Sequence, residues 1–246
     1  MPESTRESHA GVGDDQADEG SDGLSTPRSQ LVVLPDSPDT RLLVELTSHA
    51  NDLSEAAHSL GRALDCGEGS DVWEPLTSHA VTAYIRPFIH SNVRTRLDQM
   101  PEFPGIPAEL LATHDVIRKY RNTTVAHSQS DLVMPLPVAL LGGVDQVIRV
   151  WGMTVVHPMP GAIAIRFADL LTTMESIVDA AMQPVTERLR TWVQTQSPAT
   201  VQQWQGPEVT HSTDDAFNGF RRRSRIPRFT GYMHTEQVQG GTDPHE

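Results

Sequence analysis

Residues 41–66 read RLLVELTSHANDLSEAAHSLGRALDC, and their pattern predicts the fold class. Apolar and small side chains recur there at spacings of three and four, which places them along one face of a helix. The residues on this face are Leu42, Leu43, Leu46, His49, Leu53, Ala56, Ala57, Leu60 and Leu64. We expect an amphipathic helix of about 25 residues that ends near Gly67, because glycine is common just past a helix C-terminus. Other elements must cover its apolar face.

Three further segments have helical spacing. The second helix is expected over residues 72–100, with a kink at Pro87, because proline lacks the amide hydrogen that a helix interior uses. The third helix is expected to begin at Pro107. The last helix is expected over residues 162–196, and Pro184 should bend it.

Residues 131–158 have a different pattern. LVMPLPVAL and VIRVWGMTVVHP are apolar, extended segments joined by GGVDQ, which predicts a β-hairpin. Pro135 and Pro137 fit an edge strand, because a proline nitrogen has no hydrogen to donate to a neighbouring strand. The expected fold is mostly α: one domain over residues 39–196, with a bundle of about four long helices and a small β-hairpin between the third and fourth.

The two ends of the chain, residues 1–38 and 197–246, have no sustained apolar period. Such segments bury too little apolar surface to offset the entropy of ordering them, so both are predicted to be disordered. The first is an acidic tail, and the second carries a basic cluster, RRRSR, at 221–225. The apolar segment LVVLP at 31–35 either docks on the domain or adds a short strand, and its pattern favours neither.

Charge and composition exclude several classes of protein. A net charge of −13 argues against a protein that coats DNA, which needs many cations facing phosphates. Cys66 is the only cysteine, so neither an intrachain disulfide nor a cysteine-based zinc site can form. No His spacing suggests a metal, and GxSxG and glycine-rich phosphate loops are absent, so we expect no metal and no cofactor. The apolar run at 134–144 is too short to span a bilayer and the N-terminus lacks a secretory signal, which predicts a cytoplasmic protein without membrane contact.

One segment points to chemistry: HDVIRKYRNTTVAHS, residues 114–128. Asn122 follows Arg121 directly, and four residues separate Asn122 from His127. This arrangement resembles the motif of the HEPN superfamily, in which an Arg and a polar residue precede a His near the end of a helix. The upstream YIRPF at 84–88 also looks like bacterial proteins that share this bundle.

The resemblance implies a homodimer that cleaves RNA without metal, acting as a toxin or in phage defence, with a cognate antitoxin or regulator that the sequence does not identify. In that mechanism the imidazole of His127 takes a proton from a ribose 2′-OH, and the guanidinium of Arg121 stabilises the charge that develops on the phosphoryl oxygens. Asn122 orients the imidazole or donates to a phosphate oxygen. Supporting or RNA-binding residues would be Arg118, Lys119, His114, Tyr84, Arg86 and His90.

Geometry constrains this site. On an unbroken helix, residues six apart are about 120° out of phase and about 9 Å apart along the axis. Arg121 and His127 would then not reach the same atom. Either the helix loosens at Thr123–Thr124, or two chains assemble the site across a two-fold axis, as a homodimer does.

Structural interpretations of the same residues remain open. Arg121 can bridge to an acid, and His127 can satisfy carbonyls at a helix C-terminus. His114 can belong to the core, and Arg86 can tie helices together. A non-catalytic HEPN-like protein that dimerises or binds a partner is therefore the alternative to a ribonuclease. A third hypothesis is a regulatory protein that binds RNA through the tail at 221–229.

Overall fold

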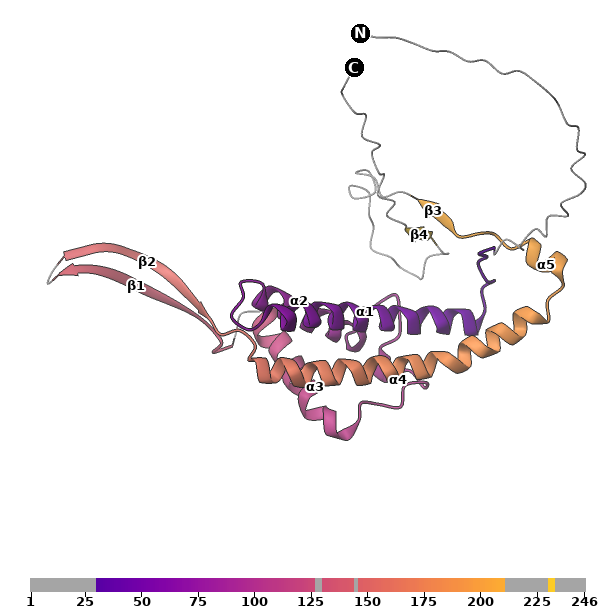
Figure 1. The fold of residues 1–246 in the computed structure, drawn as a ribbon, viewed down its shortest axis with the longest axis horizontal. Coiled ribbons are helices and arrows are strands. Elements are labelled where there is room, and N and C mark those ends of the chain that lie inside the picture. The colour runs from indigo at the N-terminus through magenta and orange to yellow at the C-terminus, as the bar shows by residue number, and fades with distance from the viewer. Residues whose placement is uncertain (1–29, 127–129, 144–145, 211–229, 233–246) are drawn as a thin grey trace, which may run out of the picture. The chain divides into compact units, whose positions relative to one another are not determined.

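The computed structural model of the protein describes residues 30–126, 130–143, 146–210 and 230–232 (Figure 1). The prediction of a mostly helical protein with a hairpin between the third and fourth helices is confirmed. The main elements are α1 (Pro38–Cys66), α2 (Trp73–Ile85), α3 (Ala108–Tyr120), β1 (Val133–Gly143), β2 (Gln146–Val156) and α4 (Gly161–Gln194).

Both ends of α1 have strong local signals. The amide of Thr40 donates to the hydroxyl of Ser37 at 3.1 Å, and the amide of Ser37 donates to the hydroxyl of Thr40 at 2.7 Å. This reciprocal pair is a capping box, which satisfies amides that have no partner inside the helix. At the other end, Gly67 has a φ of 85°, and its amide donates to the carbonyl of Ala63 at 3.0 Å. A side chain at this backbone angle would be strained, so glycine stops the helix here.

The second helix is shorter than the sequence predicts. α2 ends at Ile85 and is followed by the 3₁₀ turn η1 (Arg86–Phe88), irregular chain, and a second 3₁₀ turn, η2 (Leu97–Gln99). The expected helix over 72–100 is therefore wrong beyond Ile85. The physical reason is Pro87, which has no amide hydrogen for a helical bond and ends the helix instead of kinking it.

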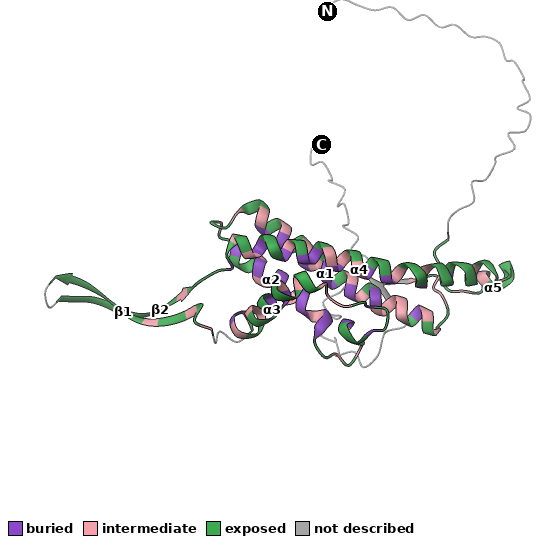
Figure 2. Ribbon diagram, turned by 90° about the horizontal axis from the view of Figure 1, so that it is seen from below, coloured by how far each residue is buried: buried purple, intermediate pink, exposed green. Residues whose placement is uncertain are grey.

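The core lies where α1 faces α2 and α4, and α3 packs beside α4. Figure 2 shows the buried residues of these helices as stripes along their lengths. The fully buried side chains include Leu46, Leu53, Leu60, Tyr84, Ile117, Phe167, Leu171, Met174 and Val178. The apolar spacing of the expected first and last helices thus supplies most of the core.

α4 continues through Pro184 as one helix, and Figure 1 shows it curving toward its C-terminal end. A proline in a helix interior leaves the carbonyl four residues earlier without its usual donor. Here that residue is Ala180, which is exposed like Pro184, so the carbonyl lies on the side of the helix that faces water.

The strands β1 and β2 pair antiparallel, as predicted. The register runs from Val133 opposite Val156 to Leu140 opposite Arg149, and then shifts so that Leu141 lies opposite Val147. This shift is a β-bulge close to the turn. The hairpin is therefore regular over its central residues, and side chains that lie opposite each other point to the same face.

The ends of the domain have more structure than the sequence predicts. Within the segment at 31–35, Val33 and Leu34 dock without forming a strand: the amide of Val33 donates to the carbonyl of Gln205 at 2.8 Å, and Leu34 packs against the core. Within the predicted disordered tail at 197–246, the structure has α5 (Pro198–Gln202) and a short parallel pair, β3 (Glu208–Thr210) with β4 (Thr230–Tyr232). The predicted disorder of 1–29 and the basic cluster at 221–225 lie outside the described residues.

Candidate functional site

The motif segment begins where α3 changes its hydrogen bonding. After Tyr120 the chain forms the π-helical turn η3 (Arg121–Val125), in which the amide of Ala126 donates to the carbonyl of Arg121, five residues earlier, at 2.9 Å. π turns widen a helix and are frequent at functional sites. The helix therefore loosens at the motif, which is one of the two ways in which Arg121 could approach the segment of His127.

Arg121 and Asn122 are in contact on this turn. Nη1 of Arg121, which is half-buried, donates to Oδ1 of the exposed Asn122 at 3.2 Å. Within the described part of the chain, the Arg121 guanidinium makes no ion pair. The interpretation of Arg121 as an arginine that bridges to an acid therefore finds no support among these residues. An amide neighbour leaves the cationic charge uncompensated, so it can attract an anion.

His127 lies outside the described residues, as do the two residues after it. On either side of these three residues, Oγ1 of the buried Thr124 and Oγ of Ser130 lie 2.7 Å apart and share a hydrogen bond.

Two more cations lie next to this turn. Arg118 and Lys119 are exposed in the last turn of α3, where positive side chains also suit the partial negative charge of a helix C-terminus. With Arg121 they form a group of three cations over four consecutive residues. We refer to Arg118, Lys119, Arg121 and Asn122 as the motif surface.

Tyr84 and His114 lie inside the protein. The Tyr84 hydroxyl and Nδ1 of His114 are 2.7 Å apart and share a hydrogen bond, and both side chains contact the ring of Phe88. Burial lowers the pKa of His114 and raises the pKa of Tyr84. Both residues are therefore neutral, and neither is open to a substrate. Their geometry matches the core interpretation of His114 and not the expected contact with RNA.

Arg86 joins an ion-pair network. Its guanidinium lies 2.6 Å from Oε2 of Glu55 and 3.4 Å from Oδ1 of Asp52, both on α1. Asp52 also pairs with Arg94, and Glu55 lies 2.8 Å from the imidazole of His79. The hydrogen bond from Arg86 holds the pKa of the Glu55 carboxyl below its ordinary value. Arg86 thus ties η1 to α1.

His90, expected as a supporting residue, lies beyond η1 in irregular and exposed chain. Nothing in the sequence indicated Asp52, Glu55 and Arg94, which meet Arg86 or each other from 31 to 42 positions away in the chain. No local spacing signals such partners.

His49 is a second buried histidine that the sequence placed only on the apolar face of the first helix. Its Nε2 lies 3.0 Å from the carbonyl of Thr95, and Nδ1 has no hydrogen-bond partner within the described residues. Burial, reinforced by the charge of Arg94, lowers the pKa of His49 to about 4. The residue is neutral and inaccessible to solvent, which fits a structural role in the core.

Among residues 30–126, 130–143, 146–210 and 230–232, no group of three or more His, Cys, Asp or Glu side chains is arranged to hold a metal ion. Every helix in the same residues is too short or too polar to cross a membrane. Comparison with protein-family models, with curated proteins and with solved structures finds no match to this chain. The motif surface is therefore judged on its own geometry.

Proposed function

We propose that the protein is a metal-independent endoribonuclease of the HEPN type, with Arg121, Asn122 and His127 as its catalytic residues. The observation that carries the proposal is the π turn η3, on which the guanidinium of Arg121 contacts an amide and, among the residues that the structure describes, no acid. A cation in this state can bind a phosphate group without first leaving a carboxylate. Arg118 and Lys119 add to the positive potential that an RNA backbone would meet.

The chemistry follows from these residue types. The neutral imidazole of His127 takes the proton of a ribose 2′-OH, and the resulting alkoxide attacks the adjacent phosphorus. The guanidinium of Arg121 stabilises the negative charge on the phosphoryl oxygens, and Asn122 orients the guanidinium through their hydrogen bond. The bond to the 5′-oxygen breaks and that oxygen takes up a proton. The products are a 2′,3′-cyclic phosphate and a 5′-OH, and DNA, which has no 2′-OH, is not cleaved.

The test is incubation of the full chain with a mixed-sequence RNA in excess EDTA, beside His127→Ala and Arg121→Ala. Two matched controls come from elsewhere on the helices: His58→Ala on α1 and Arg190→Ala on α4, both exposed. We expect the wild type and both controls to leave 2′,3′-cyclic phosphate ends. The two motif variants should lose at least a hundredfold in rate, since removing a general base or a charge-stabilising donor costs about that much.

A different pattern would reject the proposal. Equal cleavage by the wild type and His127→Ala would show that the activity belongs to another residue or to a contaminant. Absence of cleavage by every variant over a range of RNA sequences would favour the second candidate, a HEPN-like protein that dimerises or binds a partner without catalysis. The observation that favours this second candidate is the hairpin β1–β2, whose apolar side chains are exposed.

A further inference from the structure

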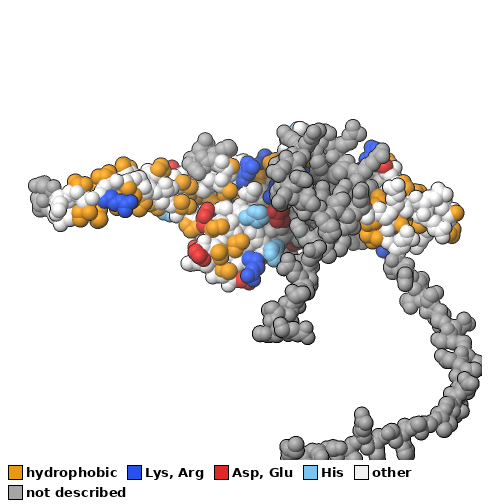
Figure 3. All heavy atoms as spheres, turned by 90° about the horizontal axis from the view of Figure 1, so that it is seen from above, with side chains coloured by type: hydrophobic (Ala, Val, Ile, Leu, Met, Phe, Trp, Pro, Cys, Tyr) orange, Lys and Arg blue, Asp and Glu red, His pale blue; other side chains and the backbone are white. Residues whose placement is uncertain are grey.

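The hairpin has the composition of a buried element but is exposed. Both strands are almost continuously apolar, as is typical of strands covered on two faces. Figure 2 nevertheless shows the hairpin as mostly exposed, and Figure 3 shows hydrophobic atoms gathered along it. The exposed large apolar side chains are Leu132, Met134, Leu140, Leu141, Val147, Ile148, Val150, Trp151, Met153 and Val156.

The exposed apolar surface of the hairpin is large for a segment without a binding partner. Summed over both faces of the hairpin, the exposed surface of these ten residues is on the order of 900 Å². Successive side chains of a strand point to opposite faces, so this apolar surface is divided between the two faces. A hairpin of two strands is also at best marginally stable in water without a partner for its apolar face.

The two edges of the hairpin differ in what they can bind. The amide of His157 donates to the carbonyl of Leu132 at 2.8 Å, and hydrogen-bonded pairs alternate with pairs that point outward. By this alternation Pro135 and Pro137 lie at outward positions of β1. Neither has an amide hydrogen, so the outer edge of β1 is a poor site for another strand.

The outer edge of β2 has no such block. The same alternation makes Val150, Gly152, Thr154 and Val156 the outward residues of this strand. In the described part of the chain β2 pairs with β1 alone, so these amides and carbonyls have no third strand beside them. Another strand can therefore pair with the outer edge of β2, whereas the prolines prevent pairing at the outer edge of β1.

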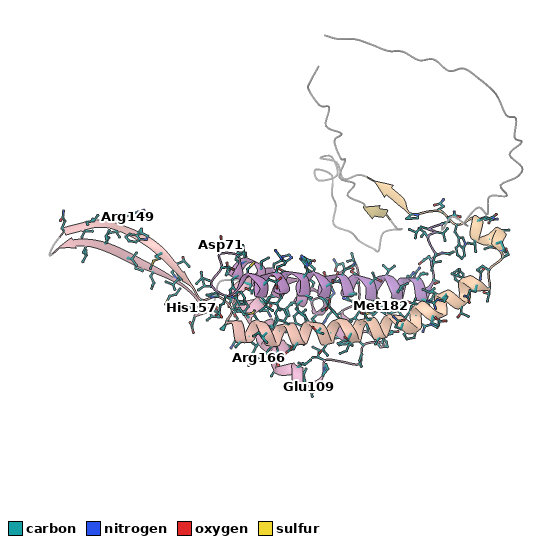
Figure 4. All side chains as sticks on the ribbon, in the orientation of Figure 1. Asp71, Glu109, Arg149, His157, Arg166 and Met182 are labelled. Carbon is teal, nitrogen blue, oxygen red and sulfur yellow. The ribbon has the colours of Figure 1, made fainter. Side chains whose placement is uncertain are left out.

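Charge indicates what kind of strand this edge accepts. The chain carries a net charge of −13, so two copies repel each other overall. Between Val133 and Val156 the only charged residues are Asp145 and Arg149, so the hairpin is nearly neutral. Arg149 lies on β2 (Figure 4), with its guanidinium over the ring of Trp151 at 5.3 Å. Two hairpins can therefore meet with little like-charge repulsion.

We propose that the hairpin is a dimerisation element, in which β2 pairs antiparallel with β2 of a second copy of this chain. Such a contact is isologous, because the same edge is used by both partners across a two-fold axis. The result is a four-stranded sheet with β1 of each copy outermost. The prolines of β1 then lie on both outer edges and prevent further growth, so the assembly stops at two chains.

The second candidate function does not say which surface binds or what binds to it. The hairpin as the surface and a second copy as the partner answer both points, whether or not the chain cleaves RNA. Its test is the mass of the full chain in solution, measured by light scattering on a sizing column over a range of concentrations. We expect twice the chain mass of 27.1 kDa. Since mass is read without RNA, failure of the ribonuclease proposal leaves this result untouched.

A matched pair of variants tests the edge. Val150→Lys places a charge on the outer edge of β2, where it should repel the second copy and give a monomer. Ala139 lies directly opposite Val150 on the same face but on β1, so Ala139→Lys adds the same charge on the proline edge and should remain a dimer. Circular dichroism of both variants should match the wild type, which separates loss of pairing from loss of folding.

Other results would overturn the proposal. If both variants are monomers, the shared face and not the β2 edge joins the copies. If the wild type is a monomer at every concentration, the occupant is not a second copy. Co-sedimentation of that monomer with vesicles of phosphatidylcholine and phosphatidylglycerol would then identify a lipid surface as the occupant instead. If Val150→Lys remains a dimer, the interface lies outside β2.

Discussion

The last helix and the hairpin are both rich in apolar residues, yet they use them differently. The apolar stripe of α4 is buried against α1 and α3, and its central residues, such as Phe167 and Met174, have no exposed surface. The strands β1 and β2 expose most of theirs. Apolar composition therefore predicts that a segment will be covered, but not that the same chain provides the cover. In this protein the helices complete their own core and the hairpin does not.

The largest expected effect tests this comparison with one residue type. Met174 on α4 is fully buried, whereas Met153 on β2 is 40% exposed. Met174→Ala should lower the free energy of unfolding by about 2–5 kcal/mol, because it leaves a cavity in the core. Met153→Ala should change the stability of the isolated chain by less than about 1 kcal/mol. Urea denaturation at low protein concentration measures both, and equal losses would show that the hairpin face is covered within one chain.

The next effect concerns charge inside the helical part. Asp52 is buried and pairs with both Arg86 and Arg94. Asp52→Ala should cost about 2–3 kcal/mol, since it leaves the mostly buried Arg94 without its carboxylate. The matched control is Asp39→Ala, which removes a more exposed pair with Arg188 and should cause a much smaller loss. A negligible effect at Asp52 would mean that Arg94 finds another acceptor.

The third effect is a pH dependence of the free energy of unfolding that arises in the helical part and not in the hairpin. The pKa of His49 is lowered to about 4 in the folded protein, while an unfolded chain has the ordinary value near 6.5. The unfolded state therefore binds more protons between these values, so the free energy of unfolding falls by up to about 1.4 kcal/mol for each unit that the pH drops from 6.5 toward 4. His49→Gln should reduce this slope, and His58→Gln, which changes an exposed residue of the same helix, should not. Denaturant midpoints measured across this range give the slope.

The same pH range should have little effect on the proposed pairing of hairpins. The imidazole of His49 faces Arg94, Asp52 and the carbonyl of Thr95, all in the helical part. Asp145 is the only acid between Val133 and Val156, and histidine is absent there. A dimer that separates at pH 5 while the helices remain folded would contradict the β2 edge as the contact, since that edge has no titratable side chain.

How far the sequence predicts this molecule depends on the range of the forces involved. α1, α4 and the hairpin were predicted because helical and strand periods are local properties of the chain. The second helix is shorter than its spacing predicts, because helical periodicity continues past Pro87 while the missing amide hydrogen of Pro87 ends the helix. α5 and the β3–β4 pair were missed because their short segments have no sustained apolar period.

The same difference between local and long-range interactions applies to the candidate site. The sequence predicts that either the helix loosens at Thr123–Thr124 or two chains assemble the site, and the π turn η3 is a loosening of this kind. A core position for His114 was one of two interpretations that the sequence left open, because the contact with Tyr84 that decides between them joins side chains 30 residues apart. A spacing pattern identifies residues of the right chemistry, but only tertiary packing decides which of them reach solvent.

The last prediction tests whether Tyr84 is a core residue or part of the site. Its hydroxyl has Nδ1 of His114 as partner, so Tyr84→Phe leaves a buried nitrogen without a hydrogen bond and should cost about 1–2 kcal/mol. If Tyr84 is a core residue, the melting temperature falls and the rate of RNA cleavage below that temperature stays the same. If it contacts RNA, the rate falls while the melting temperature holds. Thermal melting with an RNA assay on the same samples separates the two outcomes.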